Sequence, residues 1–137
     1  MTEEPIIDPA LPIIDAHHHL WFLPPATLDA MARGTSIAAT ALLPVYRAHA
    51  RYLFDEFHRD VTSGHNVRAS VFIDARAMYK QDGPAALRSV GEVEFVNGVA
   101  AMAASGTFGE ARLCAAIVGG VDLTLGDAAR EVMLAHI

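Results

Sequence analysis

The segment Ile13-Ile14-Asp15-Ala16-His17-His18-His19 changes from apolar to polar within a few residues. A short apolar run of this kind is typical of a buried β-strand, and here its polar end points to a site. We therefore predict the first strand at this segment. Side chains of a strand alternate between its two faces, so Asp15, His17 and His19 should share one face. His18 should lie on the other.

The rest of the chain shows hydrophobic periodicities of both helices and strands. The predicted elements are helices at 44–64, 93–103 and from an Asp127 N-cap to the last residue, and strands at 67–73 and 113–118. Pro44 suits the first turn of a helix, where a backbone N–H is not needed. Strand and helix alternate three times, which is the order of an α/β fold with parallel strands.

One domain is expected over 1–137. The length of 137 residues, with 53% apolar and 19% charged residues, is that of an ordinary globular domain. Residues 1–12 form a leader that contains several prolines. Residues 24–43 are interpreted as an inserted loop over the site, in which 27–32 could form one or two helical turns.

Charge and composition exclude several classes of partner. With 16 acidic and 10 basic residues the net charge is −6, and no basic cluster is present to bind nucleic acid or an anionic membrane. The acidic start, with Glu3 and Glu4, is unlike a secretory signal, and no apolar run reaches the ~18 residues of a membrane span. Cys114 is the single cysteine, so a disulfide within the chain is excluded and a cytoplasmic location is expected. Its thiol is interpreted as a small buried group.

His17 and His19 are candidate metal ligands. Their Cβ atoms should lie roughly 6–7 Å apart, which lets both imidazoles reach one ion at ~2.1 Å. Imidazole nitrogen is a good ligand for zinc, and Asp15 could orient a ligand histidine as a carboxylate behind it. The alternative is that three adjacent histidines cap a strand and bind backbone or water. Ligands of parallel α/β folds collect at the carboxyl ends of strands, which favours the metal.

Other candidates are weaker. Asp74 follows the second strand and could line the same mouth, although a carboxylate there is often a solvated turn residue. Glu92 and Glu94 begin a helix, where the helix dipole stabilises acids, so a structural role is expected. The sequence has no serine-nucleophile elbow, phosphate-binding loop or dinucleotide fingerprint. Metal chemistry is therefore the best supported hypothesis.

Residues 14–21 resemble the opening of the amidohydrolase-related family, a group of metal-dependent hydrolases that also holds lactonases and decarboxylases. Further segments that resemble the first three strand-helix units of such proteins are 52–57, 63–67, 90–98 and 116–123. The resemblance covers nearly the whole chain apart from the leader and the predicted insertion.

The resemblance implies a (β/α)8 TIM-type barrel, in which His17 and His19 match the metal pair of the first strand. It implies zinc-dependent hydrolysis of a lactone, ester or amide in a small-molecule substrate. Decarboxylation on the same scaffold is an alternative, as is a non-catalytic remnant or interaction module. The family's other ligands and its catalytic aspartate belong to later strands of a barrel of about 250 residues. We therefore expect a fragment with low activity alone, which could self-associate through open sheet edges.

Overall fold

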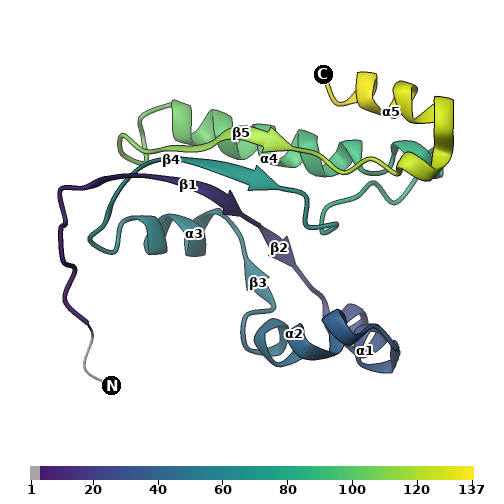
Figure 1. The fold of residues 1–137 in the computed structure, drawn as a ribbon, viewed down its shortest axis with the longest axis horizontal. Helices are drawn as coiled ribbons and strands as arrows, with labels where there is room; N and C mark the ends of the chain where they lie inside the picture. The colour runs from purple at the N-terminus through teal and green to yellow at the C-terminus, as the bar shows by residue number, and fades with distance from the viewer. Residues whose placement is uncertain (1–3) are drawn as a thin grey trace.

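The computed structural model describes residues 4–137, apart from the side chains of 38 and 39, and shows a mixed α/β fold (Figure 1). Three parallel strands pair in the order β1 (Pro12–His18), β4 (Asn66–Ile73) and β5 (Arg112–Val118). Spatial order therefore follows chain order. The predicted α/β class and the three predicted strands are confirmed. Within the described residues the sheet is open and does not close into a barrel.

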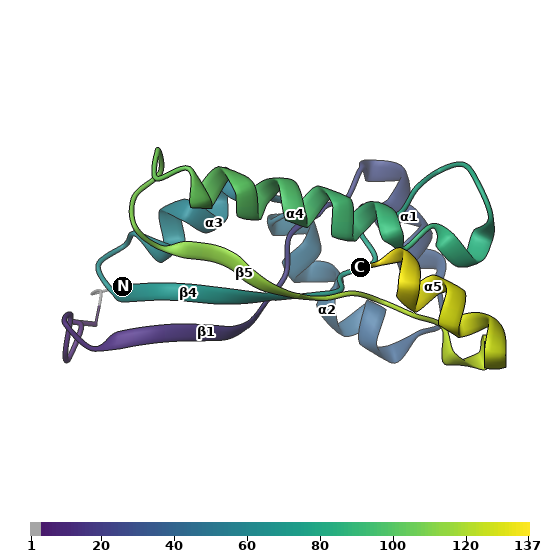
Figure 2. The same ribbon diagram turned by 90° about the horizontal axis from the view of Figure 1, so that it is seen from above.

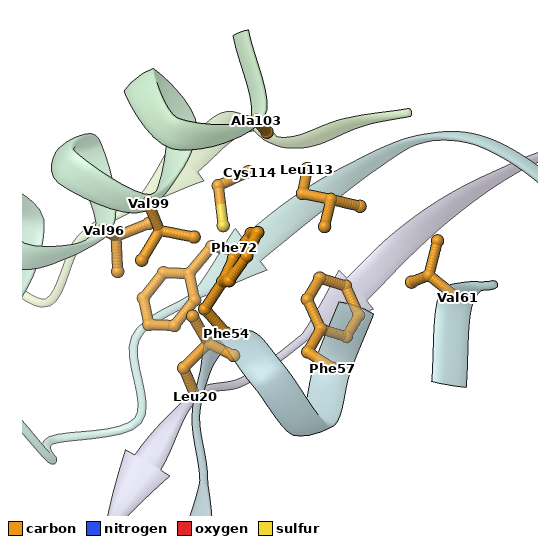
Figure 3. Packing of buried hydrophobic residues seen from close by; sticks show 10 residues of the cluster. All are labelled: Leu20, Phe54, Phe57, Val61, Phe72, Val96, Val99, Ala103, Leu113 and Cys114. Atoms are coloured by element: carbon orange, nitrogen blue, oxygen red, sulfur yellow. The ribbon is translucent and has the colours of Figure 1, made fainter. Parts of the chain in front are cut away.

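Two helices make the crossovers between these strands and supply one side of the core. They are α3 (Phe54–Val61) and α4 (Val90–Ala104), and both lie on the same face of the sheet, as Figures 1 and 2 show together. Figure 3 shows the side chains that pack between them and the sheet, namely Leu20, Phe54, Phe57, Val61, Phe72, Val96, Val99, Ala103, Leu113 and Cys114. The helical members recur at spacings of three and four, which brings them onto one side of each helix.

The opposite face of the sheet carries no helix within the described part of the chain (Figure 2). Apolar side chains are exposed there: Ile14 of β1 is 68% exposed and Val118 of β5 is 51% exposed. Parallel sheets are ordinarily covered on both faces, so this surface is unusual for its class.

Residues 24–43 are not the loop that the sequence suggested. The segment between β1 and α3 contains β2 (Trp21–Phe22), α1 (Pro25–Arg33), α2 (Ile37–Ala48) and β3 (Arg51–Tyr52). Pro25 occupies the first turn of α1, where the missing N–H has no intrahelical partner to lose. The prolines that suggested a loop thus begin a helix, and Leu28 buries its side chain on it.

The predicted helix over 44–64 is two helices separated by a strand. Pro44 lies inside α2 rather than at its first turn. The break allows β3 to pair with β2 in an antiparallel ribbon, and Trp21 Nε1–H donates to the His49 carbonyl at 2.7 Å. These tertiary contacts end α2, and apolar spacing along the sequence does not record them.

The last helix, α5 (Ala129–Ala135), also begins differently from the prediction. Ala128 stands at its N-cap, not Asp127, because the 3₁₀ helix η2 (Leu123–Ala128) runs directly into it. Between residues 4 and 137, no helix is both long and apolar enough to cross a bilayer.

Candidate functional site

The imidazoles of His17 and His19 converge at the carboxyl end of β1. Their Nε2 atoms are 3.1 Å apart, and the rings meet edge to face with centroids separated by 4.8 Å. His17 is exposed and His19 is half-buried. The two side chains share a face, as strand alternation predicts.

A backbone carbonyl fixes the tautomer of His19. Its Nδ1 lies 2.8 Å from the carbonyl oxygen of Ile73, the last residue of the neighbouring strand β4. A carbonyl only accepts, so Nδ1 carries the proton and Nε2 presents a lone pair. Ligand histidines of metal sites are commonly held in this way.

The pair fits two positions of a zinc ion. Nitrogens bound to a tetrahedral zinc at ~2.0–2.1 Å lie about 3.3–3.4 Å from each other, close to the 3.1 Å between these Nε2 atoms. No group of three or more His, Cys, Asp or Glu side chains among the described residues is placed to hold a metal. This part of the chain therefore offers two ligands and not a complete set.

His18 points the other way and belongs to the core. It is 7% exposed, and its ring stacks on Phe57 with centroids 4.1 Å apart. Its Nε2 lies 3.4 Å from Cys114 Sγ, and burial lowers the pKa of His18 while raising that of the Cys114 thiol to about 12. Both groups are thus held neutral at pH 7.

Asp15 bonds to backbone rather than to a ring. Its Oδ1 accepts the N–H of His17 at 3.1 Å. The oxygen that orients a candidate ligand is instead the carbonyl of Ile73. Asp15 pairs with the buried Ser70 of β4, as His18 pairs with the buried Phe72, because the pairing is irregular between Asp15 and His18. The prediction that Asp15 shares a face with His17 and His19 is therefore wrong.

Asp74 lies beside the histidine pair, at the carboxyl end of β4. It lines a cleft of about 380 Å³ together with His19, Trp21, Tyr46 and Arg76. The sequence-based expectation placed Asp74 at the same mouth as the pair, and the structure brings the two strand ends together.

A second cleft opens on the other side of Asp74. Its volume is about 670 Å³, and its walls include Tyr79, Ser89, Gly120 and Asp122. Asp74 and Arg76 line both clefts, so they form the divide between them.

Glu92 is the residue of this site that sequence reasoning missed. It is 1% exposed, and its carboxylate accepts the N–H groups of Ala75 at 3.2 Å and Ala77 at 2.8 Å. These two N–H groups belong to the loop that follows Asp74, so the carboxyl group of Glu92 lies beside that of Asp74. Burial, followed by this contact with Asp74, raises the pKa of Glu92 to about 7.

A signal for this burial is present in the sequence. Glu92 precedes Val96 by four positions and Val99 by seven, which places it on the buried side of α4. Acids in a first helical turn are ordinarily solvated and stabilised by the helix dipole. The sequence analysis followed this general preference and did not use the spacing.

Tyr79 and Gly120 complete the surroundings of Asp74. The Tyr79 hydroxyl donates to Asp74 Oδ1 at 2.9 Å, and burial together with this bond raises the pKa of Tyr79 to about 12. A Cβ on Gly120 would lie 2.6 Å from the same oxygen, so only glycine allows this close approach. Arg76, with a left-handed φ of 56°, has its Nε 4.0 Å from Asp74 Oδ2.

His58 and His136 form hydrogen bonds elsewhere in the fold. His58 Nε2 is 2.7 Å from the Phe108 carbonyl, and His136 Nε2 is 3.3 Å from Ser89 Oγ. Neither histidine lines the cleft that contains His19.

Comparison with known proteins gives no match among family models, curated proteins or solved structures.

Proposed function

We propose that this chain supplies part of the metal centre of a hydrolase of the amidohydrolase-related type, with His17 and His19 as two ligands of a zinc ion. The observation that carries the proposal is the convergence of their Nε2 atoms at 3.1 Å, with the His19 tautomer fixed by Ile73. The family resemblance of residues 14–21 points to the same pair.

A zinc ion held there would lower the pKa of a bound water and polarise the carbonyl of a lactone, ester or amide. The chain's own residues would prepare the site. The bond from His19 Nδ1 to the Ile73 carbonyl keeps Nε2 free to act as a ligand. Trp21 and Tyr46 form aromatic walls of the adjacent cleft, which suits a small organic molecule.

Completion of the site needs further ligands. Catalytic zinc ordinarily takes three protein ligands and leaves one position open, so at least one donor must come from outside the described residues. The resemblance assigns these donors to later strands of a (β/α)8 barrel. Parallel strands in chain order, with both crossover helices on one face, support β1, β4 and β5 as its first three strands.

Zinc binding tests the proposal directly. We expect the purified chain to take up zinc in equilibrium dialysis and the double variant His17→Ala/His19→Ala to bind it at least tenfold more weakly. The matched control is His49→Ala, which removes an exposed imidazole outside the pair and should bind as the unmodified chain does.

The competing interpretation is that the two rings are only hydrogen-bonded, with His17 Nε2–H donating to His19 Nε2. Equal, weak zinc uptake in the unmodified chain and the double variant, with unchanged circular dichroism, would establish that interpretation and contradict a metal centre.

A further inference from the structure

We propose that Asp74 and Glu92 act as one acid–base unit, a carboxylic acid hydrogen-bonded to a carboxylate, which exchanges a proton with a small molecule bound in the cleft beside His19. The position of this unit next to a metal pair rests on the proposed function. The unit itself rests on geometry that is independent of any metal.

The carboxyl groups of Asp74 and Glu92 lie side by side, and that of Glu92 is shielded from water. Two ionised carboxylates at hydrogen-bonding distance repel each other, so such pairs hold one proton between them. Glu92 is 1% exposed and is held beside Asp74 by the N–H groups of Ala75 and Ala77, so a hydrogen bond between the two carboxyl groups requires a proton on one of them. The raised pKa of Glu92 agrees with a proton on this residue.

The two members of the pair differ in their exposure. Glu92 is anchored by the N–H groups of Ala75 and Ala77 and has almost no surface, so it is a positioning residue and a proton partner. The Asp74 side chain is 18% exposed and lines both clefts, so it is the member that can touch a ligand.

Charged and titratable groups from several elements surround the pair. From the loop after β4, Tyr79 donates to Asp74 and the exposed Arg76 guanidinium approaches it at 4.0 Å. His19 of β1 lines the first cleft and Asp122, after β5, lines the second. Lys80, on the same loop as Tyr79, is paired with Glu94 at 2.7 Å.

Arg76 is paired with Asp74, but no cation forms an ion pair with Glu92 among the described residues, so a proton shared with Asp74 compensates the burial of Glu92.

In hydrolysis the unit would donate its proton to the leaving atom. The bond between the acyl carbon and the leaving oxygen or nitrogen breaks, its electron pair stays on that atom, and an O–H or N–H bond forms there. The attacking water then returns one proton to the pair, so the unit ends the cycle as it began. Proton donation should accelerate hydrolysis most for molecules with basic leaving groups, namely lactones, alkyl esters and unactivated amides.

Titration of the Glu92 carboxyl by carbon-13 NMR tests the unit without a substrate. We expect a midpoint near pH 7 in the unmodified chain and in the control Glu94→Gln, which removes an exposed acid on the same helix. In Asp74→Asn the midpoint should fall by at least one pH unit, because the amide can donate to Glu92 and leaves no charge to repel it. Glu92→Gln identifies the resonance.

A midpoint between pH 4 and 5 in the unmodified chain, or an unchanged midpoint in Asp74→Asn, would overturn the proposal. Zinc uptake should be the same in Asp74→Asn as in the unmodified chain, because Asp74 is not one of the proposed ligands. The histidines could fail to bind zinc while Glu92 still titrates near pH 7 in the unmodified chain and at lower pH in Asp74→Asn. That result would contradict the proposed function and would support the acid–base unit.

Leaving-group dependence tests the proton transfer in a zinc-loaded preparation. Asp74→Asn should slow hydrolysis of phenyl acetate at least tenfold, and that of 4-nitrophenyl acetate much less, because nitrophenolate leaves without a proton. Equal losses for the two esters would overturn the donor role of Asp74. Absence of hydrolysis of both esters by the zinc-loaded, unmodified chain would overturn that role for this chain as well.

Discussion

The two faces of the sheet show an inversion of the usual rule for burial. On the face covered by α3 and α4, the ionisable His18 is 7% exposed and packs on Phe57. On the open face, Ile14 of the same strand is 68% exposed, and an irregularity in the pairing of β1 with β4 between Asp15 and His18 reverses the alternation of faces between these two residues. The position of the helices, and not the polarity of a side chain, determines which residues of β1 are buried. An exposed apolar face of a parallel sheet is ordinarily covered by a further layer of structure.

The three adjacent histidines at the end of β1 differ in role according to the face on which they lie. His18 serves the core, whereas His17 and His19 keep their Nε2 atoms available on the open side. The four predictions below test this contrast, beginning with the largest effect.

Phe72→Ala should cause the largest loss of stability on the covered face. Phe72 is fully buried between the sheet and its helices, and truncation of such a ring costs about 3–5 kcal/mol. Urea unfolding followed by circular dichroism measures this difference. A loss below about 1 kcal/mol would contradict the assignment of this face as the core.

Stability should fall as the pH rises from about 4.5 to about 7. The pKa of Glu92 is raised to about 7 in the folded chain from 4.5, so its stabilising contribution is complete at low pH and is lost as pH rises through 7. The difference amounts to at most about 3 kcal/mol. Urea unfolding at several pH values should show this slope in the unmodified chain and a much smaller slope in Glu92→Gln. Equal slopes in the two proteins would contradict it.

His18→Ala should destabilise the fold by about 2 kcal/mol, because it removes a buried ring stacked on Phe57. His17→Ala should change stability by less than about 0.5 kcal/mol, since that imidazole is exposed. Thermal unfolding of both variants without added metal gives the comparison. Equal effects would show that the two faces of β1 do not differ in packing.

Ile14→Ser should have the smallest effect on stability, within about 0.5 kcal/mol, because Ile14 has no covering layer. The change should reduce any self-association through the open face, measured by analytical ultracentrifugation. A loss of 2 kcal/mol or more would show that this face is buried in solution, by a second copy or by another segment.

Much of the fold was predictable from local patterns. The runs at 67–73 and 113–118 are strands as predicted, and the spacing over 93–103 marks α4, because a buried strand or helix face imposes a regular spacing on the sequence. The segment 24–43 was predicted wrongly because its prolines begin α1 and lie within α2, positions that composition alone does not distinguish from loops.

The candidate site, like the fold, contains features that the sequence predicts and features that it does not. The sequence predicted that His17 and His19 share a face and that His18 does not, because side chains alternate along a strand whatever its partner. It did not predict the pairing irregularity that separates Asp15 from them. The folded chain was needed to bring Glu92 beside Asp74, to orient His19 on the carbonyl of Ile73, and to cover one face of the sheet with helices while leaving the other open. Those relations depend on how strand ends and helix ends meet in space, and no local periodicity encodes them.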